Sequence, residues 1–171
     1  MATLLELLMP QYAAAQQVAK NDERIKASYV TIPSPSGNGS IKAYLVRPDS
    51  ADTRNEKPSK IAGVLVVHEN RGLNPHTEDV ARRFALENFM AFAPDALTPM
   101  GGYPSDDYRG GQLFREIDRD RMTQDFIAVA RWLKARPDCT GMIGATGFCF
   151  GGGMSNNLAV LLGEEIGRAH V

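Results

Sequence analysis

A glycine-flanked stretch, residues 147–151, constrains this chain more than any other part of its sequence. It follows an apolar run, residues 142–146, and precedes a run that favours a helix, residues 152–162. A Gly-x-nucleophile-x-Gly turn between a strand and a helix strains the backbone at its centre, and its glycines remove side chains that would collide there. We therefore interpret this stretch as a nucleophile elbow centred on Cys149.

A thiol suits this position because the unpaired N–H groups at the start of the next helix favour a thiolate and can also receive an oxyanion. The alternative is a buried, structural Cys149, since free cysteine is among the most buried residue types. Two other glycine-rich sites are excluded by spacing. No lysine follows Gly153 as a phosphate-binding loop requires, and residues 141–153 contain no G-x-G-x-x-G run.

Composition narrows the class of protein further. The 171 residues are 43% hydrophobic and 23% charged, as expected for about one globular domain. The net charge of −1 does not indicate the basic surface that binds nucleic acid. Cys139 and Cys149 are the only cysteines and lack the spacing of a zinc or redox site, so we expect a cytoplasmic protein. No apolar run is long enough to span a membrane, and no feature indicates an oligomeric state.

The periodicity of apolar residues predicts alternating strands and helices. Strands are expected over 26–31, 40–46, 61–67, 90–94 and 142–146, and helices over 3–20, 77–88 and 117–135. Polar or glycine-rich stretches predict loops over 48–60 and 98–114. This order indicates an α/β fold with a mostly parallel sheet and helices on both faces, whose active site lies at the carboxyl ends of the strands.

Three polar groups fall at such strand ends, namely His-Glu-Asn-Arg-Gly at 68–72, Asp95 after Ala-Pro, and the elbow. With these motifs in this order, the chain resembles the dienelactone hydrolase family over about residues 28–162. The resemblance implies an α/β-hydrolase fold and cleavage of a small ester or lactone, the chemistry of a carboxymethylenebutenolidase. It implies a cysteine nucleophile and neither a metal nor an organic cofactor.

The resemblance also assigns roles to residues. Cys149 would be the nucleophile, Glu69 would activate its thiol, and the backbone N–H groups of Asn70 and Phe150 would form the oxyanion hole. Without the resemblance, Glu69 would be a solvated carboxylate. His68 is expected to be a structural hydrogen-bonding residue, because the catalytic histidine of this fold follows the nucleophile.

Substrate binding is less defined by the sequence. Arg71 could hold a substrate carboxylate or pair with Glu78 or Asp79, and we expect the pairing. Tyr103 and Tyr108 could line a substrate cleft or only pack. Members that cleave dienelactone carry an arginine after the Pro-Asp strand end, whereas residues 96–99 here are Ala-Leu-Thr-Pro, which argues against a lactone acid as substrate.

The end of the chain departs from this fold, in which the triad's acid and histidine follow the nucleophile. Only Glu164, Glu165 and His170 follow Cys149, too close to the elbow helix to reach its N-terminus. Residues 165–171 match one reading frame of GAGATCGGAAGAGCACACGTC, which is typical of sequencing-adapter read-through. We expect a helical extension over 1–25, an incomplete α/β-hydrolase domain over 26–163 and a non-native tail over 164–171.

Two consequences follow from this interpretation. Residues from Gly163 onward are expected not to pack, which leaves the strand at 142–146 as an apolar edge, and the chain by itself is expected to turn over little ester. The rival function is a non-catalytic or redox-sensing module in which Cys149 is a structural or reactive thiol.

Overall fold

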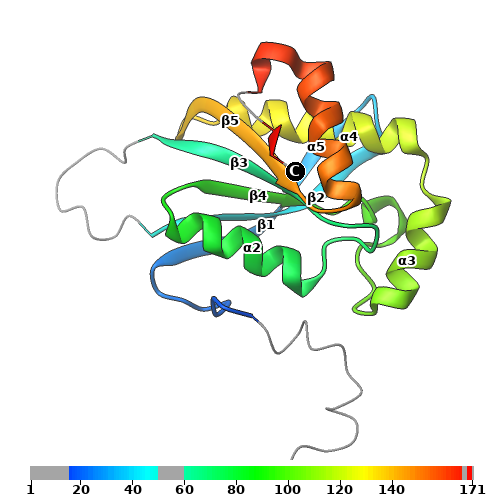
Figure 1. Ribbon diagram of the computed structural model, residues 1–171, viewed down its shortest axis with the longest axis horizontal. Helices are drawn as coiled ribbons and strands as arrows, with labels where there is room; N and C mark the ends of the chain where they lie inside the picture. The colour runs from blue at the N-terminus through cyan, green and yellow to red at the C-terminus, as the bar shows by residue number, and fades with distance from the viewer. Residues whose placement is uncertain (1–15, 50–59, 167–168, 171) are drawn as a thin grey trace, which may run out of the picture.

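The computed structural model describes residues 16–49, 60–166 and 169–170 of the chain. Within these residues, six strands form one mixed sheet in the order β1-β2-β4-β3-β5-β6 (Figure 1). The strands are β1 (Ile25–Ser34), β2 (Gly39–Pro48), β3 (Ile61–Val67), β4 (Met90–Pro94), β5 (Cys139–Gly147) and β6 (Ala169–His170). β1, β2 and β4 pair antiparallel, and β4, β3, β5 and β6 pair parallel, so the predicted mainly parallel α/β sheet is confirmed.

Helices cover both faces of this sheet. The described helices are α2 (Pro75–Leu86), α3 (Asp107–Glu116), α4 (Arg119–Lys134) and α5 (Phe150–Leu162), with short 3-10 turns at Thr98–Met100 and Gly163–Glu165. α2 lies on one face, α4 and α5 lie on the other, and α3 stands beyond one end of the sheet (Figure 1). No described helix is long and apolar enough to cross a membrane.

The core consists of two apolar layers separated by the sheet. Leu65 and Val67 of β3 belong to the layer under α4 and α5, while Val64 and Val66 belong to the layer under α2. Successive side chains of a strand point to opposite faces, so a strand covered on both sides is apolar throughout. This confirms the prediction of a doubly buried strand at residues 61–67.

The parallel register brings the ends of β3 and β5 together, with Val67 opposite Gly147. The residues that follow these two strands therefore start at the same edge of the sheet. They are the segment that begins at His68 and the elbow around Cys149, as the α/β prediction requires.

The predicted loop over 98–114 is wrong in part, because it contains most of α3. The carboxylate of Asp106 accepts the N–H of Arg109 at 2.5 Å and so caps the helix. Gly110 lies inside α3, where a Cβ would stand 2.3 Å from the carbonyl oxygen of Arg71. The glycine therefore allows the helix to pack closely on the segment after β3.

Both ends of the described chain also differ from expectation. Residues 16–24 form turns and bends rather than a helix, and residues 1–15 lie outside the described residues. The expectation that residues from Gly163 onward do not pack is wrong for Ile166, which is 4% exposed and joins the layer under α4 and α5, while residues 167–168 and 171 lie outside the described residues. Glu165 accepts from Arg131 at 3.0 and 3.1 Å, and β6 pairs with Ala145 and Thr146, which covers part of the edge of β5.

Candidate active site

Cys149 lies at the turn between β5 and α5 with φ 55° and ψ −117°. A positive φ is uncommon for a residue with a side chain and marks local strain. A Cβ on Gly147 would stand 2.6 Å from the carbonyl oxygen of Val67, and one on Gly151 would stand 2.3 Å from the same oxygen. The two glycines are therefore needed for the elbow to pack against the end of β3.

The thiol of Cys149 is free and exposed, whereas that of Cys139 is free and buried. Cys149 opens onto a pocket of about 510 Å³. Other residues expected at the site line the same pocket: Asn70, Arg71, Tyr108 and Phe150. The fold thus gathers five of the seven site residues expected from the sequence around one cavity.

Two backbone N–H groups at this pocket have no acceptor among the described residues, those of Asn70 and Phe150. Phe150 is the first residue of α5, where a helix has no internal acceptor for its N–H groups. Unpaired donors beside an exposed thiol can stabilise negative charge on a bound carbonyl oxygen.

Glu69 is not among the residues that line the pocket of Cys149. Its exposed carboxylate has no partner among the described residues and lines a neighbouring pocket of about 310 Å³. The two pockets share Arg71, Asp107 and Tyr108.

Three arginines line the Cys149 pocket: Arg71, Arg115 and Arg119. None of them forms an ion pair with a described residue, so the expected pairing of Arg71 with Glu78 or Asp79 is wrong. The guanidinium carbon of Arg119 lies 4.4 Å from the centre of the Phe114 ring, a cation–π contact.

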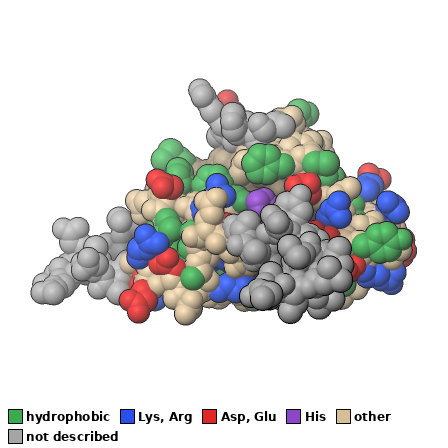
Figure 2. Space-filling model, turned by 60° about the horizontal axis from the view of Figure 1, so that its bottom comes forward, with side chains coloured by type: hydrophobic (Ala, Val, Ile, Leu, Met, Phe, Trp, Pro, Cys, Tyr) green, Lys and Arg blue, Asp and Glu red, His purple; other side chains and the backbone are tan. Residues whose placement is uncertain are grey.

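Glu78 and Asp79 are instead buried on α2, where both pair with Arg82. One described carboxylate lines the Cys149 pocket, that of Asp107, and it accepts a hydrogen bond from the hydroxyl of Tyr103 at 2.8 Å. In Figure 2, Lys and Arg side chains gather among Asp and Glu at the end of the molecule where α3 lies. The pocket therefore offers more positive than negative charge to a ligand.

Tyr103 is separated from the pocket of Cys149 and lines another cavity of about 270 Å³. Burial and the neighbouring carboxylate of Asp107 raise the pKa of Tyr103. Tyr108 is exposed and lines the Cys149 pocket, so of the two tyrosines only Tyr108 adjoins the thiol.

The strand end at Asp95 has a structural role. Its buried carboxylate accepts the N–H groups of Leu73 at 3.2 Å, Leu97 at 3.0 Å and Tyr103 at 2.8 Å. This carboxylate therefore joins the segment after β3 to the turn after β4. No group of His, Cys, Asp and Glu suited to a metal ion occurs among the described residues.

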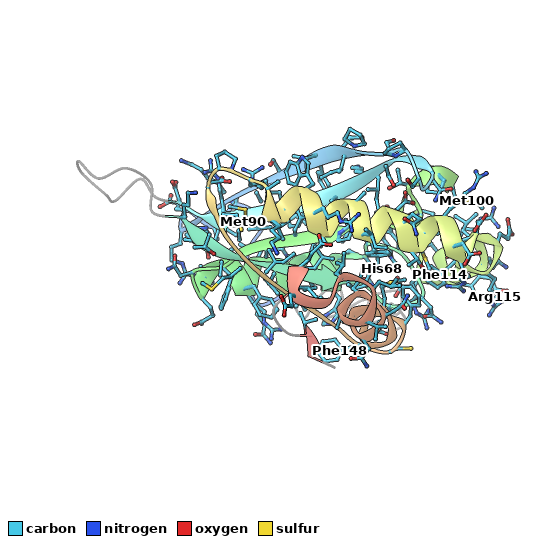
Figure 3. The ribbon with its side chains drawn as sticks, turned by 90° about the horizontal axis from the view of Figure 1, so that it is seen from above. His68, Met90, Met100, Phe114, Arg115 and Phe148 are labelled. Carbon is cyan, nitrogen blue, oxygen red and sulfur yellow. The ribbon has the colours of Figure 1, made fainter. Side chains whose placement is uncertain are left out.

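Sequence reasoning missed two of the pocket arginines, Arg115 and Arg119. Both lie close to the boundary of α3 and α4, and Arg115 points away from the core at the outer end of the molecule (Figure 3). The sequence offered no clear signal, since Arg115 lies between the predicted loop (98–114) and the predicted helix (117–135), and Arg119 lies in the first turn of that helix.

Comparison with known proteins agrees with the resemblance seen in the sequence. The model of the dienelactone hydrolase family matches residues 41–170. The relative named "Putative hydrolase fragment YghX" of Escherichia coli (strain K12) is 48% identical over 115 residues, which cover 67% of this chain and 93% of the relative. A "Putative carboxymethylenebutenolidase" of the same strain is 31% identical over 144 residues, 81% of this chain and 49% of the relative.

Solved structures agree with these sequence relatives. A "Putative Dienelactone Hydrolase" from Klebsiella pneumoniae has a TM-score of 0.66 and 27% identity, over 85% of this chain and 58% of that structure. The chain thus spans about half the length of the carboxymethylenebutenolidase relatives, but nearly all of the shorter one. With the family model matched over most of its length, this chain belongs to the dienelactone hydrolase family.

Proposed function

We propose that this chain carries the nucleophile and the oxyanion-binding groups of a hydrolase that cleaves carboxylic esters or lactones through Cys149. The observation that supports this most is an exposed thiol at a strained elbow, in one pocket with two backbone N–H groups that have no acceptor in the described part of the chain. Relatives named carboxymethylenebutenolidase support an ester or lactone as substrate.

The proposed reaction begins with addition of the Cys149 thiolate to the substrate carbonyl carbon. The electron pair moves to the carbonyl oxygen, which accepts the N–H groups of Asn70 and Phe150. The carbon–oxygen bond of the ester then breaks, the alcohol leaves with a proton, and a thioester remains on Cys149. Addition of water to the thioester releases the acid and regenerates the thiol.

Efficient turnover needs a base that moves these protons, and no histidine is among the described residues that line the pocket. We propose that the acid and histidine of the triad are contributed from outside these 171 residues. Removal of one triad member from a hydrolase leaves only about 10³–10⁴-fold catalysis over water, so the chain alone should acylate once and release product slowly.

Glu69 is proposed to help activate the thiol. Its side chain adjoins the pocket of Cys149 through the shared lining of Arg71 and Tyr108, so the role requires the carboxylate to turn toward the sulfur. Catalytic hydrogen bonds are often longer in the absence of substrate, which is compatible with this role.

The three pocket arginines favour a substrate with an anionic group near the ester. Guanidinium groups bind carboxylates through paired N–H donors, and Arg71, Arg115 and Arg119 have no described carboxylate to bind. The anionic group would thus be held from the segment after β3 and from α3 and α4, and not from the turn after Asp95.

The proposal is tested with 4-nitrophenyl acetate and the 171-residue chain at pH about 9, where thiols ionise. We expect a burst of about one nitrophenolate per chain, then slow steady release because deacylation lacks its base. The Cys149→Ala variant should lose the burst, and Glu69→Gln should slow it.

Mass spectrometry should find the acetyl group on the peptide that contains Cys149, and Cys139 serves as the internal control because its thiol is buried. A burst of the same size in Cys149→Ala would contradict the proposal. Fast steady turnover that depends on Cys149 would contradict the part of it that places the base elsewhere.

A further inference from the structure

His68 directly follows β3 and is 1% exposed, so its ring belongs to the interior of the protein. Aromatic rings surround it: Phe114 at 6.0 Å, Phe126 at 6.2 Å and Phe150 at 6.3 Å between ring centres. Figure 3 shows His68 and Phe114 side by side in the interior, while Phe148 lies apart from them at the edge of the molecule. The imidazole is therefore fixed in place beside the first residue of α5.

Both ring nitrogens of His68 are engaged. The backbone N–H of Ala96 donates to Nε2 at 3.0 Å, so Nε2 must carry a lone pair and the proton is on Nδ1. Nδ1 then donates to the backbone carbonyl oxygen of Glu69. Burial lowers the pKa of His68, which agrees with a neutral ring of this tautomer. With no free nitrogen, His68 cannot act as a general base.

The carbonyl that His68 holds belongs to the peptide bond between Glu69 and Asn70. This peptide is planar and trans, since no cis peptide occurs among the described residues, and in a trans peptide the C=O and N–H bonds point in opposite directions. A carbonyl drawn inward to His68 therefore turns the N–H of Asn70 away from the core. Asn70 lines the pocket of Cys149, where this N–H has no described acceptor.

We propose that His68 is a positioning residue that aims an oxyanion donor. Its Nδ1–H fixes the Glu69–Asn70 peptide so that the N–H of Asn70 faces the reacting carbonyl oxygen, and its ring, stacked on Phe150 at 29°, supports the residue that supplies the second donor. The inference rests on the proposed function, because it requires an oxyanion to form at Cys149.

Preorganised donors are effective because they need no reorientation when charge develops on the oxygen. A peptide between a strand end and a loop can rotate unless something holds it, and Ala96, in the turn after β4, supplies a fixed hydrogen-bond donor for the imidazole. Two hydrogen bonds thus connect the turn after β4 to the Glu69–Asn70 peptide, one from Ala96 to His68 and one from His68 to Glu69.

Two substitutions separate this role from simple packing. Asn places its amide nitrogen near the position of Nδ1, so His68→Asn can still donate to Glu69 but loses the acceptor for Ala96. Gln places its amide oxygen near the position of Nε2, so His68→Gln can still accept from Ala96 but loses the donor to Glu69. Each variant loses one of the two hydrogen bonds, which makes them matched controls for stability.

The readout is the ratio of two rates at Cys149, measured with the 171-residue chain. Acylation by 4-nitrophenyl acetate develops an oxyanion, whereas alkylation by iodoacetamide displaces iodide and develops none. The ratio therefore reports on the oxyanion donors separately from access to the thiol and its ionisation.

We expect the ratio to fall at least about 10-fold in His68→Gln, a part of the roughly 10²–10³-fold loss that removal of a whole donor causes. In His68→Asn it should stay within about 3-fold of the unsubstituted chain, because the remaining donor keeps the peptide oriented. An unchanged ratio in His68→Gln, or an equal fall in both variants, would overturn the inference.

Failure of the proposed function gives a different result, which is visible in the unsubstituted chain. If iodoacetamide alkylates Cys149 there but 4-nitrophenyl acetate never acylates it, the hydrolase function is wrong, and the role of His68 that rests on it is wrong too. A measurement on the unsubstituted chain also avoids dependence on the folding of variants. Nitrogen NMR of labelled histidine should show the His68 proton on Nδ1, and a proton on Nε2 instead would overturn the inference.

Discussion

The arginines around Cys149 are exposed side chains whose charges are free to meet a ligand. Arg71, Arg115 and Arg119 come from three separate segments and line one pocket, where the only acidic lining residue among those described, Asp107, already accepts the hydroxyl of Tyr103. Exposed charges contribute little to protein stability but can discriminate between ligands of different charge. Their effect should thus appear in substrate preference rather than in folding.

Arg115→Gln tests this at a single residue. We expect it to lower the acylation rate with a 4-nitrophenyl ester that carries a free carboxylate by about 5-fold, the effect of losing roughly 1 kcal/mol from an exposed ion pair. The rate with neutral 4-nitrophenyl acetate should stay the same.

Arg109→Gln is the matched control, because Arg109 also lies on α3 but hydrogen-bonds Gln112 at 3.1 Å and does not line the pocket. If Arg115→Gln lowers the acylation rate equally with the two esters, this arginine does not distinguish charged from neutral substrates.

Helix α3 connects the pocket to the segment that follows β3. Its N-cap is Asp106, and its aromatic residue Phe114 packs edge-on against Phe150 at 4.8 Å. Gly110 and Gly111 each disfavour a helix by about 1 kcal/mol relative to alanine, which is why the sequence favours a loop here. The tertiary contact of Gly110 with the carbonyl of Arg71 explains why one of these glycines is required.

Gly110→Ala should therefore displace α3 or the Asn70–Arg71 segment, because the new Cβ would stand 2.3 Å from the Arg71 carbonyl oxygen. We expect a loss of about 1–3 kcal/mol in the free energy of unfolding, as for other overpacked sites. The acylation rate of Cys149 should fall as well. Urea denaturation and the nitrophenolate burst measure the two effects.

Gly111→Ala provides the control, since its Cβ would meet only the Asn70 carbonyl oxygen at 3.9 Å, an ordinary contact. Alanine there should leave acylation unchanged and stabilise the chain by up to about 1 kcal/mol through helix propensity. The idea of a close-packed α3 is wrong if the two alanine variants behave alike.

At the scale of the whole molecule, the last described residues belong to the packed fold. Ile166 lies in the core layer under α4 and α5, and the backbone carbonyl of Glu165 accepts from Lys134 Nζ at 2.8 Å. β6 adds a short parallel partner to β5 at the edge of the sheet (Figure 1). Exposed apolar side chains remain nearby, Phe148 at 59% and Val160 at 81%.

Ile166→Ala should thus lower the free energy of unfolding by about 2–5 kcal/mol, the range for truncating a buried aliphatic side chain. Val160→Ala, at an 81% exposed position of α5, should change it by no more than about 0.5 kcal/mol. Chemical denaturation of the two variants measures the difference. If Ile166→Ala is as mild as Val160→Ala, the residue that follows the 3-10 turn at Gly163–Glu165 does not contribute to the core.

The sequence by itself determined the strands, the main helices and the elbow. Residues 61–67 and 90–94 have the observed bounds because a strand buried on both faces is apolar throughout, a pattern readable within the segment. The elbow was predictable for the same reason, since a strained nucleophile between two glycines is a local requirement of backbone sterics.

Only the tertiary structure decided which side chains share the pocket and what holds them. Arg71 lines the same pocket as Arg115 and Arg119, although more than 40 residues of chain separate it from them. Glu69, only two residues from Arg71, does not line that pocket but a neighbouring one. The helical state of α3 and the burial of Ile166 likewise depend on contacts between distant segments. Local propensity is weak at these positions, so packing set by the order of strands in the sheet determines their structure.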